Sequence, residues 1–230
     1  SIMPCIAKKA ERELPSMDSA GHGSDVDLVI TTRELARMAR AEHLDVKNIA
    51  ESSFDSPLGD GTGAGVIFGV TGGVMEAALR TVYEVVTGKT LDKVEFTAVR
   101  GTEGIKEAEI DLGARKIRVA VAHGTGNAKK LLESIKSGEK SYDFIEVMGC
   151  PGGCVTGGGQ PIVSAKDLMY CDPKTLRAAA LYGEDSGKQL RKSHENPSLK
   201  KLYDEFLGEP CGHKSHELLH THYEPKKKYR

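Results

Sequence analysis

The chain has 230 residues, of which 39% are hydrophobic and 28% are charged, and its 32 basic residues nearly balance its 33 acidic ones. This length allows one large domain or two small ones around a buried core. The net charge of −1 gives no basic surface of the kind that binds nucleic acid, and no segment approaches the roughly 18 apolar residues of a membrane span. We therefore expect neither nucleic-acid nor membrane partners.

The cysteines are odd in number and stand at positions 5, 150, 154, 171 and 211, which is not the spacing of a disulfide framework. In an intracellular protein, clustered cysteines favour metal binding or catalysis over disulfides. The first residues lead straight into charged sequence without the apolar core of a signal peptide. We therefore expect a cytoplasmic location.

Hydrophobic periodicity predicts alternating strands and helices over the first two thirds of the chain. We expect a helix start within 1–14, a strand at 27–31, a helix at 32–40, a loop at 50–63, a strand at 64–69, a helix at 73–87, strands at 93–100, 106–112 and 115–122, a helix at 126–137 and a strand at 144–148. This order predicts an α/β fold with a mixed, partly parallel sheet flanked by helices.

The last third of the chain shows only helical patterns. We expect helices at 173–183, 188–193, 198–207 and 212–222, and therefore divide the chain into a main domain at 1–163 and a helical C-terminal extension at 164–230.

A glycine-rich segment from Gly149 to Gly159 follows the last predicted strand and holds Cys150 and Cys154. Thiolates are the soft ligands of iron–sulfur clusters, and glycines let the backbone approach an inorganic cluster closely. A tight turn with two structural cysteines is the simpler alternative, and a zinc site is another, although zinc would require a second close pair of ligands. Cys5 has no near companion in the sequence and would have to meet the pair in space.

Two long motifs carry a resemblance to a known family. Glu146–Pro161 resembles the iron-only (FeFe) hydrogenase signature E-x-M-x-C-x-G-G-C-x-x-G-G-G-Q-P, and Met3–Glu11 resembles that family's signature M-P-C-x-x-K-x-x-E. Other stretches that look like the family are Gly65–Arg80, Arg177–Tyr182, Arg191–Pro197 and Gly212–His220. The resemblance covers essentially the whole chain.

The resemblance implies a 4Fe–4S cubane joined through a cysteine sulfur to a di-iron unit with CO, cyanide and a bridging dithiolate, together called the H-cluster. By motif position, Cys5, Cys150 and Cys154 would be the cubane ligands, and Cys154 would also bridge to the di-iron unit. Lys8 would donate a hydrogen bond to a cyanide. The pocket would be lined by Met3, Phe68 and Met148. The implied activity is the reversible reduction of protons to H2 under anaerobic conditions, with ferredoxin-type electron carriers as partners. Residues 1–163 would then be part of the catalytic domain and residues 164–230 a small-subunit-like tail.

The family's signature T-S-C-C-P-x-W is absent, and the chain has no Trp. In the family this signature supplies the fourth cluster ligand and a cysteine that passes protons. The resemblance therefore implies that an N-terminal part of the catalytic domain, in the same protein or in a second chain, completes the site, and that this chain alone is inactive. The alternatives are a Narf- or Nar-like iron–sulfur assembly protein and a hydrogenase-like sensor, both disfavoured by the complete motifs.

Several polar residues receive a simpler interpretation. The tail histidines His213, His216, His220 and His222 have the spacing of a metal-binding helix face, but the resemblance makes them packing or surface residues. Cys171 and Cys211 lie outside the signatures and are expected to be unligated thiols. Glu11 and Glu146 have no assigned ligand role, and we expect structural ion pairs or proton relay.

Overall fold

The computed structural model describes residues 1–19, 21–52, 61–113 and 115–220. Its strands are β1 (Ile2–Met3), β2 (Ile30–Thr31), β3 (Ile105–Asp111), β4 (Lys116–His123) and β5 (Phe144–Met148). Its helices are α1 (Lys8–Glu11), α2 (Thr32–Ala41), α3 (Gly63–Val66), α4 (Gly73–Thr87), α5 (Thr125–Lys136), α6 (Ala165–Leu168), α7 (Pro173–Gly187), α8 (Pro197–Leu202) and α9 (His213–Leu219). None of these helices has the length and apolar character needed to cross a membrane.

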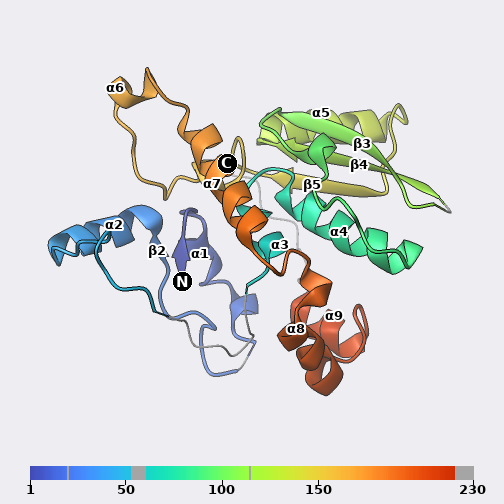
Figure 1. The fold of residues 1–230 in the computed structure, drawn as a ribbon, viewed down its shortest axis with the longest axis horizontal. Helices are drawn as coiled ribbons and strands as arrows, with labels where there is room; N and C mark the ends of the chain where they lie inside the picture. The colour runs from blue at the N-terminus through green and yellow to red at the C-terminus, as the bar shows by residue number, and fades with distance from the viewer. Residues whose placement is uncertain (20, 53–60, 114, 221–230) are drawn as a thin grey trace.

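A three-stranded mixed sheet forms the larger core (Figure 1). Strand β4 lies in the middle, antiparallel to β3 and parallel to β5. Val119 and Val121 pack with Met75 and Leu79 of α4 on one face, while the other face contacts α5 through Leu131. Alternate side chains of β4 point to opposite faces of the sheet, and a helix covers each face. The predicted partly parallel sheet flanked by helices is confirmed.

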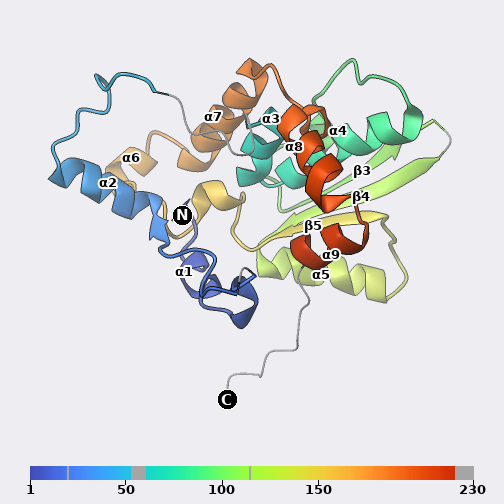
Figure 2. The same cartoon turned by 90° about the horizontal axis from the view of Figure 1, so that it is seen from below.

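A second unit is built from the N-terminal residues and lies apart from the larger sheet (Figures 1 and 2). Strand β1 pairs in parallel with β2, so that Met3 lies opposite Thr31. The Thr31 hydroxyl accepts from the backbone N–H of Glu34, and the Glu34 carboxylate accepts from the N–H of Thr31. This reciprocal capping box starts α2 where the sequence predicted it.

Two predicted strands are wrong. Residues 64–69 form α3 and a 3₁₀ turn (Ile67–Gly69), because the Thr62 side chain caps the backbone N–H of Gly65. Residues 93–100 contain only a 3₁₀ turn (Thr97–Val99), and the carbonyl of Val94 accepts from the Arg80 side chain instead of a strand. Short apolar runs do not separate strands from buried helical turns.

The predicted helix boundaries differ from the structure at both ends of the chain. The segment before Pro4 is the strand β1, since a residue preceding proline favours extended backbone. Helix α7 runs on to Gly187 and is followed by extended backbone with a 3₁₀ turn (Ser193–Glu195) in place of the helix at 188–193. A π-helical turn (Tyr203–Leu207) follows α8, and α9 ends at Leu219 within the described residues. Part of the predicted loop at 50–63 and the end of the predicted helix at 212–222 lie outside those residues.

Helix α7 lies between the two units (Figure 1) and is joined to α4 by buried charges. The Arg80 guanidinium donates to both carboxylate oxygens of Asp185 at 2.8 Å and to Glu76 at 2.7 Å, and all three side chains are fully buried. Burial alone would raise the pKa of Asp185, but hydrogen bonds from Arg80 and Arg191 outweigh it and lower that pKa to about 2. The carboxylate therefore stays charged, and the fold depends on keeping this ion pair intact. The division of the chain at 163/164 stays a prediction.

Candidate metal centre

The two neighbouring cysteines lie on the loop that leaves β5. Gly152 and Gly153 have φ angles of 88° and 96°, which residues with a side chain rarely adopt, and they reverse the chain between Cys150 and Cys154. The backbone N–H of Gly153 donates to the Cys150 carbonyl at 3.0 Å, and a 3₁₀ turn begins at Cys154. The turn therefore holds both thiols on one short loop.

The glycines that follow bring Cys5 to this loop. The backbone N–H of Gly159 donates to the carbonyl of Pro4 at 2.8 Å, and a Cβ atom at Gly157 would overlap that same carbonyl oxygen. A Cβ at Gly158 would come within 2.9 Å of the Ile6 side chain. Residues on both sides of Cys5 thus contact the cysteine loop, Pro4 through its backbone and Ile6 through its side chain.

The electrostatics of Cys154 show the same convergence. Burial raises the pKa of the Cys154 thiol, negative charge on Cys5 and Cys150 would raise that pKa further, and the Lys8 ammonium lowers it. The charges of Cys5, Cys150 and Lys8 therefore all act on Cys154. Two thiols on this loop and a third on the segment packed against Gly157 and Gly159 fit the soft ligand set and the close backbone approach of an iron–sulfur cluster.

The far side of the loop is held by the turn before α4. The backbone N–H of Thr71 donates to the Gly152 carbonyl at 3.0 Å, and a Cβ at Gly153 would come within 2.7 Å of the Thr71 nitrogen and 3.0 Å of the Met148 sulfur. Met148 therefore lies against the cysteine loop, and its implied role in lining a cofactor pocket stays a prediction. Phe68 precedes this turn and stays 47% exposed.

Lys8 and Met3 lie near the other end of the loop. Met3 belongs to β1, and Lys8 opens α1 three residues after Cys5, with its half-exposed side chain paired with Glu11. Glu11 thus forms a structural ion pair. The roles implied for Lys8, Met3 and Phe68 toward a cofactor stay predictions.

Glu146 has a structural role that the sequence left open. Its carboxylate is buried and accepts from the backbone N–H groups of Gly72 at 2.6 Å and Met75 at 2.7 Å. These groups form the start of α4, where unpaired N–H groups favour a negative charge. Glu146 therefore fixes the turn that holds the cysteine loop.

Sequence reasoning missed the side chains that fasten the loop from outside. Arg33 donates to the carbonyl of Gly158 at 3.1 Å, and Arg177 of α7 donates to the carbonyls of Val155 at 3.0 Å and Pro161 at 3.1 Å. Lys106 was missed as well: it is 5% exposed, and its ammonium donates to the Thr71 carbonyl at 2.9 Å. Of these residues, only Lys106 breaks a sequence pattern, because it is a lysine on the core-facing side of a predicted strand.

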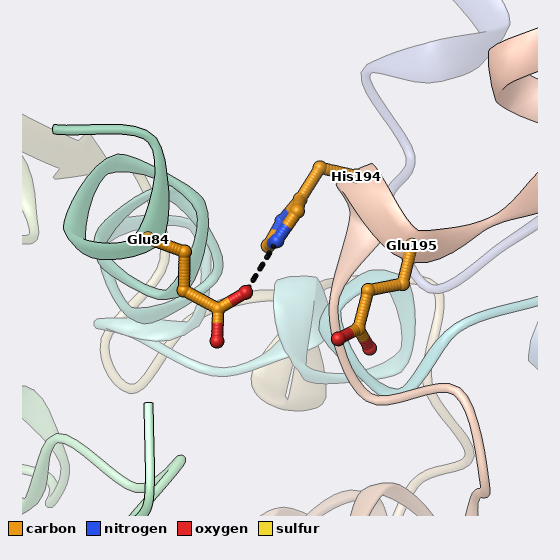
Figure 3. A group of neighbouring side chains, drawn as sticks. All are labelled: Glu84, His194 and Glu195. Atoms are coloured by element: carbon orange, nitrogen blue, oxygen red, sulfur yellow. Dashed lines mark hydrogen bonds and ion pairs between the residues drawn. The ribbon is translucent and has the colours of Figure 1, made fainter. Parts of the chain in front are cut away.

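A second group of possible ligands lies between α4 and the tail (Figure 3). One ligand atom each from Glu84, His194 and Glu195 lies within 4.8 Å of the others, and His194 points its Nε2 at a Glu84 oxygen 2.7 Å away. However, the ammonium of Lys192 donates to Glu84 at 2.7 Å and to Glu195 at 2.8 Å. The lysine supplies the positive charge that a metal would bring, so this group is an ion-pair cluster that fastens the tail.

The remaining tail candidates form no metal cluster within the part of the chain that the structure describes. The rings of His216 and His220 pack at 4.4 Å between centroids, and His213 faces Glu217. The Cys171 thiol donates to the Asp167 carbonyl, and Cys211 is exposed. His222 lies outside the described residues.

The fold and this loop define an α/β protein in which a glycine-lined loop with two cysteines contacts the segment that carries a third. The family model described as the iron only hydrogenase large subunit, C-terminal domain, matches residues 1–158, and that of the iron hydrogenase small subunit matches residues 172–226. The chain belongs to the iron-only hydrogenase family.

Individual relatives agree with this assignment. The chain is 52% identical over 225 residues to the NADP-reducing hydrogenase subunit HndD of Solidesulfovibrio fructosivorans, covering 97% of this chain and 37% of that protein. A solved structure of the [FeFe]-hydrogenase HydA1 from Chlamydomonas reinhardtii is 44% identical, with a TM-score of 0.76, covering 97% of this chain and 62% of that one. Protein NAR1 of Arabidopsis thaliana is 29% identical, covering 98% of this chain and 49% of that protein. The chain thus spans less than two thirds of the length of each.

The glycine contact with Pro4 predicts a steric test. Gly157→Ala would place a Cβ on the Pro4 carbonyl, separate Cys5 from the loop and lower iron uptake after anaerobic reconstitution to less than about half of the wild-type value. Gly149→Ala is the matched control, because a Cβ there meets nothing within 4 Å. Equal iron content per chain in the two variants would contradict the contact.

Proposed function

We propose that this chain supplies three of the four cubane ligands of an H-cluster and forms the C-terminal part of an FeFe hydrogenase catalytic domain. The convergence of Cys5 with Cys150 and Cys154 on a glycine-lined loop is the observation that supports it. When bound, the cluster would supply the reversible two-electron reduction of protons to H2. The protein would supply ligation, electrostatics and access.

Each site residue has a proposed task that its chemistry suits. Cys154, whose thiol is partly buried, would bridge to the di-iron unit. Lys8 would donate a charge-assisted hydrogen bond to a cyanide, which its half-exposed ammonium beside Cys5 allows. Met3, Met148 and Phe68 would exclude water from the iron with soft and apolar surfaces.

The fourth ligand and the proton-carrying cysteine would come from a segment outside these 230 residues. The family's T-S-C-C-P-x-W signature is absent here, and the relatives extend well beyond the matched region. Phe68 is 47% exposed beside the cysteine loop, which suits a face that a further segment covers. We propose ferredoxin-type carriers as electron donors and a cytoplasmic location.

A role in iron–sulfur assembly without H2 chemistry is the second candidate, and the likeness to NAR1 favours it. The full M-P-C-x-x-K-x-x-E and G-G-G-Q-P motifs, and the higher identity to HndD, favour the hydrogenase. The two functions differ in the cofactor. Only the hydrogenase would hold a di-iron unit, and only that unit carries CO and cyanide.

Reconstitution separates these candidates. We expect the 230-residue chain, given a 4Fe–4S cluster and a di-iron precursor, to evolve no H2, because its cubane lacks one thiolate and its proton path is incomplete. Adding a segment with the T-S-C-C-P-type signature should restore H2 evolution and produce infrared bands of CO and cyanide. Cubane uptake without these bands in the completed protein would support the assembly role. Sustained H2 evolution by the chain alone would show that another residue completes the site.

Lys8 has a neighbour that serves as its control. In the completed enzyme, we expect Lys8→Ala to lower H2 evolution about 10- to 100-fold with the cubane retained, because a partner of the cofactor is lost but no thiolate. Lys9→Ala should leave activity unchanged, because Lys9 pairs with Glu34 at 2.7 Å, on α2. Unchanged turnover of Lys8→Ala with a fully loaded site would exclude the cyanide contact.

A further inference from the structure

Lys106 is a charged residue in a core position of β3. Side chains of this strand alternate, and Lys106 lies on the same face as Ala108 and Ile110, which pack into the core beneath α4. Only 5% of Lys106 is exposed. Burying an ammonium group is costly unless it is paired and hydrogen-bonded, and a break in the apolar pattern of a strand is expected at a functional or strained position.

The ammonium is held by backbone carbonyls. It donates to the carbonyls of Thr71 at 2.9 Å and Gly101 at 3.0 Å. No carboxylate of the described residues forms an ion pair with it, and Glu146 and Glu103 act on it only at longer range. Lys106 therefore keeps a positive charge inside the protein that no adjacent anion cancels.

This charge lies directly behind the cysteine loop. The Thr71 carbonyl accepts from Lys106, while the backbone N–H of the same residue donates to Gly152, between Cys150 and Cys154. A Cβ at Gly72 would come within 3.1 Å of the Lys106 nitrogen. One residue and two hydrogen bonds thus join the ammonium to the loop, a span of at most about 10 Å.

We propose that Lys106 is the buried countercharge of the iron–sulfur site and raises the reduction potential of the cluster that Cys5, Cys150 and Cys154 hold. The inference rests on the proposed function, because it requires an iron–sulfur cluster at these cysteines. A thiolate-bound cluster is anionic and gains one negative charge when it accepts an electron, so a nearby cation in a low-dielectric interior stabilises its reduced form. Lys106 touches no ligand and is a positioning residue.

Glu146 does not cancel this effect. Its negative charge is already offset by the N–H groups of Gly72 and Met75 at the start of α4. Glu146 is the same in the wild type and in every Lys106 variant, so a difference in potential between them reports the charge of the lysine.

Three substitutions at Lys106 separate the effect of its charge from the effect of its hydrogen bonds. Lys106→Gln keeps an N–H donor without the charge, Lys106→Met removes both, and Lys106→Arg keeps the charge. The full 230-residue chain would be loaded with a 4Fe–4S cluster alone, and the midpoint potential measured by a redox titration followed by electron paramagnetic resonance. Burial lowers the pKa of Lys106 to about 8, opposed by Glu146 and Glu103, so the titration is made at pH 7, where the ammonium is charged.

We expect Lys106→Gln and Lys106→Met to lower the ratio of reduced to oxidised cluster about tenfold at a fixed potential, which is ~59 mV for a one-electron couple. Lys106→Arg should keep the wild-type potential. Lys116→Gln is the matched control: this lysine lies on β4 with its side chain 62% exposed and paired with Glu109, so solvent screens its charge and the potential should not move.

Three results would overturn the inference. A wild-type potential in Lys106→Gln with an intact cluster would show that the charge has no influence, whether or not Lys106→Met shifts. Loss of the fold in both neutral variants, measured by circular dichroism, would make Lys106 a purely structural residue. A wild-type chain that takes up no cluster would contradict the proposed function and the inference together, and is recognised from iron content before any titration.

Discussion

The contact between the Pro4 carbonyl and the glycines at 157–159 is the constraint on which the site depends. The hydrogen bond from Gly159 to Pro4 and the lack of space for a Cβ at Gly157 join two backbones without intervening side chains. Cys5 is thereby placed beside a loop that lies far from it in the sequence. The β1–β2 pair and the Arg33 side chain, which donates to Gly158, keep this contact in register. Larger residues at these glycines would force the two segments apart.

Buried charges hold the opposite side of the loop. Helix α4 begins at the turn that contacts Gly152, and the Glu146 carboxylate accepts hydrogen bonds from the N–H groups at the start of this helix. Further along the helix, Arg80 ties α4 to α7 through Asp185, and α7 returns to the cysteine loop through Arg177. These groups are paired with each other or bound to backbone dipoles, and they fix the relative positions of β5, α4 and α7.

The sequence was sufficient where one local pattern decides the structure. Helix α2, the β5 strand and the amphipathic helices α4 and α5 were predicted, because hydrophobic periodicity is local. The run at 64–69 was predicted wrongly, because a buried helical turn and a buried strand have the same apolar composition. The motifs named the three cysteines, but the partners of Glu146, Arg177 and Lys106 are distant carbonyls and N–H groups, which leave no pattern in the sequence.

Thiol cross-linking of the iron-free chain tests the central claim, the convergence of Cys5 with the loop. A short bifunctional thiol reagent, followed by peptide mass spectrometry, should join Cys5 to Cys150 or Cys154, since the Pro4 contact places Cys5 beside this loop. The exposed thiol of Cys211 provides the comparison, and it should react only at one end of the reagent. The account would be contradicted if the reagent bound Cys5 by one end only, or if it joined Cys5 to Cys211 as often as to Cys150 or Cys154.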